Sequence, residues 1–208
     1  MPADEIRGAE AARDERRGLP YSYGTLPVGR NGERTHMQLR FQTKNIQYWA
    51  KRYTVPQHEE DLMDLRPAVQ QAGRLTKAQL GDVCRWKSPR SAGHVRSNSP
   101  EYVEAVTSFS LATTCERARL ESLIVLDGVQ WPTATAILHL FHRAPYPILD
   151  FRALWSVGVD VPKQYSFDFW WKYVEFCRRV SKEAKVCMRV LDRALWQYSK
   201  EKQPPNSG

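Results

Sequence analysis

The chain of 208 residues lacks several patterns that define common protein classes. Its four cysteines include no CxxC pair and no signal peptide precedes them, which favours the reducing cytoplasm. Its apolar runs are interrupted by charge well short of membrane-spanning length. No Walker loop, dinucleotide-binding glycine pattern or Ser-His-Asp arrangement rises above chance. We therefore expect a cytoplasmic protein that does not enter a membrane.

The sequence also lacks the alternation of apolar and polar residues that is typical of strands. Apolar residues recur instead at helical spacing, which predicts an all-α protein with short connections. The first 36 residues are polar and rich in turn formers, and we interpret them as an arm or strap. Residues 37–200 form the predicted helical domain and 201–208 a tail. The predicted helices span residues 43–53, 57–65, 67–73, 76–87, 100–112, 114–126, 166–182 and 186–200.

Positive charge and aromatic rings are abundant. Lysine and arginine exceed aspartate and glutamate by 31 to 23, a net charge of +8, and the chain has seven tryptophans, nine tyrosines and seven phenylalanines. A basic excess of this size favours polyanionic partners. The rings pack into a core by default and stack on bases where their position allows it.

The most informative stretch runs from Leu123 to Gly158. An apolar helix end meets a tight turn, Asp127-Gly128-Val129-Gln130, and a second helix follows with Pro132 in its first turn. A glycine turn that opens into a helix presents unpaired backbone N–H groups, which bind anions such as phosphate. Asp150 follows at the head of a further short helix. An anion site beside a carboxylate suits chemistry on nucleic acid.

This stretch resembles the helix-hairpin-helix DNA glycosylase superfamily. Leu126, Gly128, Val129, Thr133 and Ala134 stand in register with the family hairpin, and Asp150 stands at the interval of the catalytic aspartate. The resemblance covers about residues 76–158 and implies a two-lobed helical fold with a DNA groove between the lobes. The N- and C-terminal helices would form the other lobe.

The chain differs from the family pattern in three respects. Gln130 replaces the second hairpin glycine, and Pro132 stands where bifunctional members carry a lysine. Only Cys177 and Cys187 lie near the C-terminus, too few for the family's iron–sulfur cluster. The chain is most similar to small stand-alone bacterial members, some of which are linked to defence against phages with modified bases.

The resemblance implies a monofunctional DNA glycosylase. Asp150 would activate or position a water and stabilise the positive charge that develops at C1′ as a flipped base departs, leaving an abasic site. No lysine-dependent lyase activity is expected, because proline has no amine. The excised base would be a bulky modified phage cytosine, for example a glucosylated one, or an alkylated base, in antiviral defence or base-excision repair.

The implied partner is double-stranded DNA that contains a modified base, and we expect a monomer. No cofactor is expected, although the hairpin could hold a monovalent cation. His139 and His142 have no carboxylate or cysteine partner at metal spacing, so we expect no metal site. The predicted DNA-binding residues are Gly128, Val129, Gln130, Trp131, Thr133, Lys87 and Arg90.

The segment around Trp86 supplies the remaining candidates. Lys87 and Arg90 would contact phosphates, and Trp86 would line the base pocket or pack beneath it. Tyr146 could reach the same pocket or pack within its loop. Trp131, at the hairpin tip, could contact DNA or cover the neighbouring lobe.

Each site feature also has a purely structural explanation. An aspartate directly before a helix is commonly an N-cap, and a glycine turn between helices is commonly only a connection. The alternative function is therefore a non-catalytic helix-hairpin-helix DNA-binding protein, with Asp150 buried as a cap and no pocket beside it. A nuclease would need clustered carboxylates for metal ions, and Asp150 has no acidic neighbour in sequence.

Overall fold

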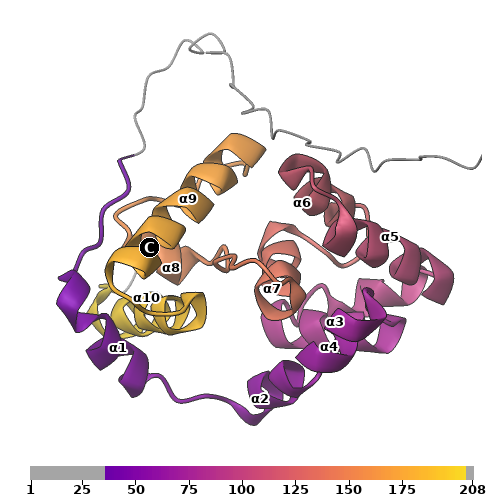
Figure 1. The fold of residues 1–208 in the computed structure, drawn as a ribbon, viewed down its shortest axis with the longest axis horizontal. Helices are drawn as coiled ribbons and strands as arrows, with labels where there is room; N and C mark the ends of the chain where they lie inside the picture. Colours follow the sequence, from indigo (N-terminus) through magenta and orange to yellow (C-terminus); the bar gives the residue numbers. More distant parts are fainter. Residues whose placement is uncertain (1–35, 205–208) are drawn as a thin grey trace, which may run out of the picture. The chain divides into compact units, whose positions relative to one another are not determined.

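The computed structural model describes residues 36–204, so the predicted N-terminal arm lies outside the described residues except at its last position. These residues form ten α-helices and two short 3-10 helices, and no strand occurs among them (Figure 1). The prediction of an all-α fold is confirmed for this part of the chain. The helices are η1 (Thr43–Asn45), α1 (Ile46–Arg52), α2 (Gln57–Asp64), α3 (Arg66–Ala72), α4 (Lys77–Lys87), η2 (Ala92–Ser97), α5 (Pro100–Ala112), α6 (Glu116–Ile124), α7 (Trp131–Phe141), α8 (Phe151–Ser156), α9 (Phe167–Glu183) and α10 (Met188–Lys202).

Local sequence signals account for several helix starts. Thr76 caps α4, and its side chain accepts a hydrogen bond from the backbone N–H of Gln79 while the Gln79 side chain accepts one from the Thr76 N–H. This reciprocal pair satisfies two amides that have no intrahelical partner. Ser99 caps α5 and Ser166 caps α9 in the simpler one-bond form. These starts lie within a residue of the predicted ones.

Two segments differ in detail from the prediction. The basic loop predicted over residues 88–94 gives way at Ala92 to the 3-10 helix η2. The last two helices are separate, as predicted, and Lys185 between α9 and α10 takes the left-handed conformation with φ of 53°. Helix α10 continues to Lys202, slightly past the predicted end of the helical domain.

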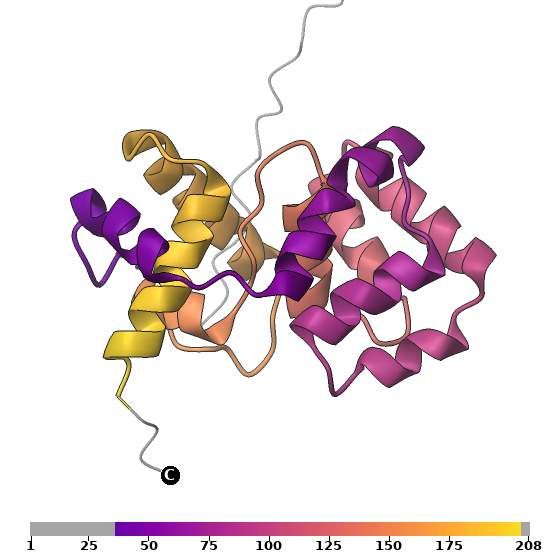
Figure 2. The same ribbon diagram turned by 90° about the horizontal axis from the view of Figure 1, so that it is seen from below.

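The buried apolar side chains form two clusters, each defined by the helices that supply it. Cluster 1 is built by α2 to α7 together with Trp170 and Val174 of α9. Cluster 2 is built by α1, α8, α9 and α10, and α10 packs on α1, α8 and α9. Figures 1 and 2 show α1 and the yellow α10 side by side, apart from α4 and α5. Half-buried Trp131 at the start of α7 contacts both clusters.

Candidate active site

The turn between α6 and α7, hereafter the hairpin (residues 126–133), needs its glycine. Gly128 has φ of +86°, a conformation that side-chain-bearing residues rarely adopt. A Cβ on Gly128 would lie 2.9 Å from the Ser91 carbonyl oxygen and 3.0 Å from Cγ2 of Val95. The N–H of Val129 closes the turn by donating to the Leu126 carbonyl at 3.0 Å. The hairpin is therefore held tightly against the segment after α4.

Three side chains from that region fix the hairpin backbone. The Asn98 amide donates to the Asp127 carbonyl, and its oxygen accepts from the Asp127 N–H, both at 3.0 Å. The Ser91 hydroxyl donates to the Gly128 carbonyl at 3.3 Å, and the Cys84 thiol lies 3.8 Å from the same oxygen. Asn98 is 3% exposed. Asn98 is not among the residues predicted from sequence, because an asparagine between two helices resembles any turn residue.

The first turn of α7 carries no side-chain cap. Gln130 occupies the N-cap position with an exposed side chain that makes no capping bond. The amides at the start of a helix have no partner within the helix, and the helix dipole adds positive character there. Pro132 has no N–H and Thr133 is fully buried, so of the first three helical residues only Trp131 could offer its N–H to an anion. The Val129 N–H is already bonded inside the turn, and the Val129 side chain is fully buried. This corrects the prediction for Val129: it shapes the hairpin rather than contacting an anion.

Two other predicted DNA-binding residues, Thr133 and Trp131, make contacts within the protein. Thr133 is fully buried, and its hydroxyl donates to the Ser88 hydroxyl at 3.1 Å, so its side chain is engaged within the protein. The Trp131 ring lies 6.1 Å from that of Tyr165 and packs against both apolar clusters, as the covering alternative predicted. Arg90 is exposed in the turn that follows α4, where it remains a candidate for phosphate contact.

Asp150 is the N-cap of α8. Its Oδ1 accepts a hydrogen bond from the Arg152 N–H at 2.9 Å, which holds the carboxylate at the helix end. The other oxygen is directed away from this bond, and 16% of the side chain is exposed. Asp150 therefore caps a helix while keeping one oxygen for a second partner.

The Asp150 carboxylate lines an open cavity of about 400 Å³, hereafter the Asp150 cavity. Segments far apart in sequence supply its walls, from the end of α1 to the last turns of α10. A cap buried without any neighbouring pocket was the expectation of the non-catalytic alternative, and the cavity departs from it. The lining residues are Tyr53, Thr54, Pro56, Trp86, Lys87, Ile148, Asp150, Ala153, Arg189, Asp192, Trp196 and Lys200.

Lys87 lies in this cavity rather than on the surface. Its Nζ is 2.5 Å from Oδ2 of Asp150, and only 13% of its side chain is exposed. The prediction that Lys87 contacts DNA phosphate is wrong for this arrangement, because the amine is directed inward to the carboxylate. An amine therefore lies beside Asp150, although Pro132 supplies none in the hairpin. The contact joins the end of α4 to the start of α8, two segments that the sequence alone does not bring together.

A buried network of charged groups backs the Asp150 cavity. Glu59 of α2 is fully buried and forms ion pairs with Arg189 and with Arg193, the latter at 2.8 Å. Its second oxygen accepts from the Tyr53 hydroxyl at 2.7 Å, and Arg189 also pairs with Asp192 at 2.9 Å. Burial acts against the ionised Glu59, but the two arginines and Tyr53 outweigh it and lower the pKa of the carboxyl.

Helix α10 supplies one continuous face of the cavity wall. Arg189, Asp192, Trp196 and Lys200 recur every three or four residues, so they share one side of the helix. The opposite side packs Leu191 and neighbouring residues into cluster 2. From sequence, this helix is predicted only to be amphipathic. The feature that marks its cavity-lining face is the burial of Asp192, which is 8% exposed, and burial cannot be inferred from the spacing of charges alone.

The two predicted base-pocket residues have different positions. Trp86 lines the Asp150 cavity and also packs against cluster 1. Tyr146 does not line it: it is 1% exposed, stacks on Trp170 at 5.8 Å and donates its hydroxyl to Glu116 at 2.6 Å. The pocket prediction for Tyr146 is therefore corrected to packing within its loop, because the loop turns that ring into cluster 1.

The C-terminal end of α4 connects the hairpin to Asp150. Lys87 contacts Asp150, and the next residue, Ser88, accepts the hydrogen bond from Thr133 of the hairpin. A second connection runs through α7, where the Thr135 hydroxyl accepts from the N–H of Leu149 at 2.9 Å. The uncapped helix end and the carboxylate are thus fixed to a common support.

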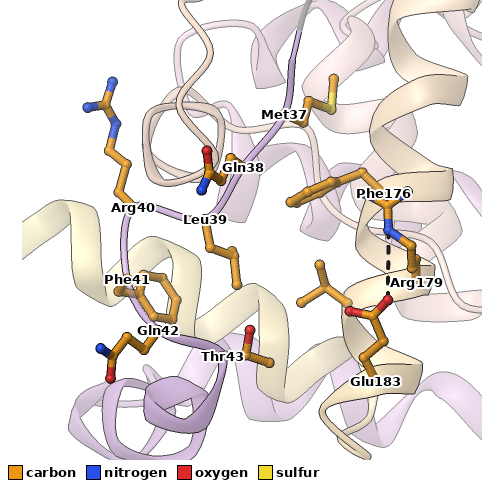
Figure 3. A pocket seen from close by; sticks show the side chains of 11 residues that line it. Met37, Gln38, Leu39, Arg40, Phe41, Gln42, Thr43, Phe176, Arg179 and Glu183 are labelled. Atoms are coloured by element: carbon orange, nitrogen blue, oxygen red, sulfur yellow. Dashed lines mark ion pairs between the residues drawn. The ribbon is translucent and has the colours of Figure 1, made fainter.

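A larger hollow of about 520 Å³ lies between the segment before α1 and the side of α9 (Figure 3). Its charged contact is the exposed ion pair of Arg179 with Glu183, at 4.0 Å. An exposed pair of this kind contributes little energy and no acid–base chemistry. The Asp150 cavity is therefore the better candidate site, although it is the smaller of the two.

Within residues 36–204, no three histidine, cysteine, aspartate or glutamate side chains gather closely enough to hold a metal ion. No helix among the same residues has the length and apolar character to cross a bilayer. In comparisons with known proteins, no family model, curated protein or solved structure matches the chain.

Proposed function

We propose that the protein is a DNA glycosylase that excises a modified base from double-stranded DNA and leaves an abasic site. The observation that carries the proposal is the placement of Asp150, a half-buried carboxylate that lines an open cavity of about 400 Å³, which the end of α4 links to the hairpin. In this proposal, the two groups of helices around clusters 1 and 2 act as two lobes with the DNA groove between them.

The hairpin would hold the strand. The uncapped N-terminus of α7 would bind a phosphate next to the extruded nucleotide through the N–H of Trp131. Exposed Arg90 would add a phosphate contact, and the net charge of +8 favours approach to a polyanion. These contacts carry no base specificity; they would place the target nucleotide at the cavity mouth.

Base release would depend on Asp150. As the glycosidic bond lengthens, positive charge develops on the sugar, and a nearby carboxylate stabilises it. The same carboxylate would position or deprotonate the water that attacks C1′. The α8 cap bond holds the carboxylate in place, so no reorganisation is needed when charge develops.

The cavity favours a bulky base over a small alkylated one. Its volume falls within the range of about 300–1,000 Å³ that buries drug-sized ligands. The rings of Trp86 and Trp196 offer flat surfaces for a base or a sugar, and Asp192 offers a hydrogen-bond acceptor. A cytosine that carries a sugar fits this chemistry, and excision of such a base would serve defence against phages that modify their DNA.

The proposal is tested with Asp150→Asn and the control Asp160→Asn. Asparagine caps helices as well as aspartate does, so the fold should persist. Incubation with genomic DNAs of different modification, followed by assays for free base and alkali-labile sites, measures excision. We expect Asp150→Asn to lower base release by about 10²–10⁴-fold with DNA binding retained, and the exposed Asp160 variant to act as wild type. Full activity in Asp150→Asn would refute the proposal.

If wild-type protein binds DNA but releases no base from any of these DNAs, the alternative of a non-catalytic DNA-binding protein is favoured. The observation that favours this alternative is the role of Asp150 as the N-cap of α8. In that case, substitutions in the hairpin would weaken DNA binding, and Asp150→Asn would change nothing that can be measured.

A further inference from the structure

A cavity of about 150 Å³, smaller than the Asp150 cavity, lies at the start of α10. Its wall comes from the end of α2, the start of α3, the last turn of α7 with the loop that follows it, and the first residues of α10. Three of the side chains that line it are arginines, Arg66, Arg143 and Arg189, and no aspartate or glutamate among the described residues does so. The permanently charged side chains in the wall of this arginine cavity are therefore all positive.

Two of the three arginines lack a carboxylate partner within residues 36–204. Arg66 and Arg143 take part in none of the ion pairs found there. The Nη2 of Arg66 donates to the His142 carbonyl oxygen at 3.2 Å, which positions the side chain but leaves its charge unbalanced. Arg143 lines the cavity from the loop after α7 and is exposed. Both guanidinium groups are thus available to an anion.

Arg189 is paired with carboxylates but is not fully satisfied. Its two terminal nitrogens form ion pairs with Glu59 and Asp192. Its Nε–H is buried and has no hydrogen-bond partner among the described residues. A buried N–H without an acceptor is costly and uncommon in native proteins. An acceptor bound in the cavity that Arg189 lines would supply the missing partner.

The start of α10 adds further donors to the same wall. Cys187 is the N-cap and makes no side-chain capping bond, and Cys187, Met188 and Arg189 all line the cavity. The first N–H groups of a helix have no intrahelical partner, and the dipole of a helix adds positive character at its N-terminus. An uncapped start of a 15-residue helix beside three arginines is an arrangement that binds anions.

The size and the donors of the arginine cavity favour a phosphate group. Its volume of about 150 Å³ is below the roughly 300 Å³ at which pockets for drug-sized ligands begin, but it accommodates an anion of a few heavy atoms. Guanidinium groups bind phosphate oxygens through paired N–H donors. Because the three arginines come from three different segments, they can contact different oxygens of one tetrahedral anion.

We propose that the arginine cavity is a binding site for a phosphate group, held by Arg66, Arg143, Arg189 and the start of α10. The group is inorganic phosphate or the phosphate of a mononucleotide, since both present the same oxygens. Neither Asp150 nor the hairpin contributes to this site, so it does not depend on the proposed function. Arg189 also lines the Asp150 cavity, so the two cavities share one side chain.

The test uses the full chain, purified free of nucleic acid, and isothermal titration calorimetry with inorganic phosphate at constant ionic strength. We expect saturable binding of one phosphate per chain. Arg143→Gln should weaken it by about tenfold or more, the usual effect of losing a charge-assisted hydrogen bond, and Arg66→Gln should have an effect of similar size. Arg117→Gln removes the same charge from an exposed position on α6 and should bind phosphate as the wild type does.

A parallel titration with deoxycytidine 5′-monophosphate distinguishes the two sources of the phosphate group. Binding of inorganic phosphate that Arg143→Gln weakens supports a site for the free ion. Binding of the mononucleotide alone, with the same dependence on Arg143, supports a site for a nucleotide phosphate. Because Arg143 is exposed, a folding defect in Arg66→Gln leaves the test intact.

Three outcomes would overturn the inference. The first is no saturable binding of either probe up to about 10 mM. The second is equal weakening in Arg143→Gln and Arg117→Gln, because the effect would then reflect net charge alone. The third is unchanged binding in both Arg143→Gln and Arg66→Gln. The titrations contain no DNA, so their result is separate from the Asp150→Asn excision assay, and either proposal can fail alone.

Discussion

The hairpin and the Asp150 cavity are built in different ways. The hairpin is formed by consecutive residues, and its shape depends on one backbone conformation, that of Gly128, and on hydrogen bonds to backbone atoms. The cavity is lined by side chains from α4, α8, α10 and the segment after α1, and ion pairs such as that of Glu59 with Arg193 lie behind it. One is a local structure and the other a product of long-range packing.

Because the two regions are built differently, substitutions in each should have different effects. If the proposed function holds, damage to the hairpin should first weaken DNA binding, because the uncapped start of α7 lies there. Damage to the charge network should first affect the stability of the cavity and of the helices around it. Only the end of α4 belongs to both, through Lys87 and Ser88. Substitutions on either side can therefore test whether the two regions are independent.

The largest effect is expected at Glu59, which is fully buried between two arginines. Glu59→Gln keeps the shape and removes the charge, which leaves Arg193 without a counter-ion. Breaking one side of a buried ion pair costs about 3–5 kcal/mol, and we expect a loss of this size in the free energy of unfolding. Denaturant unfolding measures it.

The neighbouring exposed residue supplies the control for Glu59. Glu60→Gln makes the same chemical change on the solvent side of α2 and should stay within about 0.5 kcal/mol of wild type. If Glu59→Gln were equally mild, the cavity would not depend on this network, and the contrast with the hairpin would disappear.

Gly128→Ala is expected to have the next largest effect. The new Cβ would meet the Ser91 carbonyl at 2.9 Å while the residue keeps φ of +86°, so we expect a loss of about 2 kcal/mol in stability together with weaker DNA binding. Gly73→Ala is the matched control. Gly73 has φ of +67° with nothing within 4 Å of a Cβ, so only the backbone term of about 1 kcal/mol remains.

Comparison of the Gly128 and Gly73 variants separates the cost of a positive φ, which both share, from the cost of the close contact, which only Gly128→Ala makes. Equal losses in the two variants would mean that the Ser91 and Val95 segment yields to the methyl group, and the hairpin would then be less rigid than its contacts indicate. Titration of labelled duplex DNA distinguishes a local defect from global unfolding. Only the Gly128 variant should bind less tightly while still folded.

The local features of this fold could be predicted from sequence because each is encoded within a short stretch of the chain. The reciprocal cap of Thr76 with Gln79, the proline in the first turn of α7 and the aspartate before α8 are all encoded within a few residues. Each depends on backbone preference and short-range hydrogen bonds, which do not require knowledge of the neighbouring helices.

The cavity could not be predicted in this way. Lys87 and Asp150 are 63 residues apart, and Arg193 and Glu59 are 134 apart, so each pair exists only once the helices have packed. A basic helix end is usually solvated, which is why Lys87 suggested a phosphate contact. Val129 and Tyr146 were misassigned for the complementary reason, since the prediction used their place in the chain without knowing their burial.

The smallest effect, a dependence of stability on pH, concerns the helix that joins the two regions. His139 lies on α7 and is buried. Its Nδ1 bonds to the Tyr146 carbonyl at 2.7 Å, and its Nε2 lies 3.3 Å from Nη1 of Arg189. A carbonyl requires a proton on Nδ1 and a guanidinium requires a lone pair on Nε2, so the neutral ring fits this site.

Burial lowers the pKa of His139 from its ordinary value of 6.5; Asp192 acts in the opposite direction, and the positive charges of Arg189 and Arg66 add to the lowering. The unfolded chain therefore binds a proton first as the pH falls, and stability is lost as pH drops below about 6.5. Thermal melting between pH 7.5 and 5.5 should show this loss. His139→Gln should reduce the slope, whereas His94→Gln, at an exposed position, should retain it. An unchanged slope in His139→Gln would refute the assignment of this pH dependence to His139.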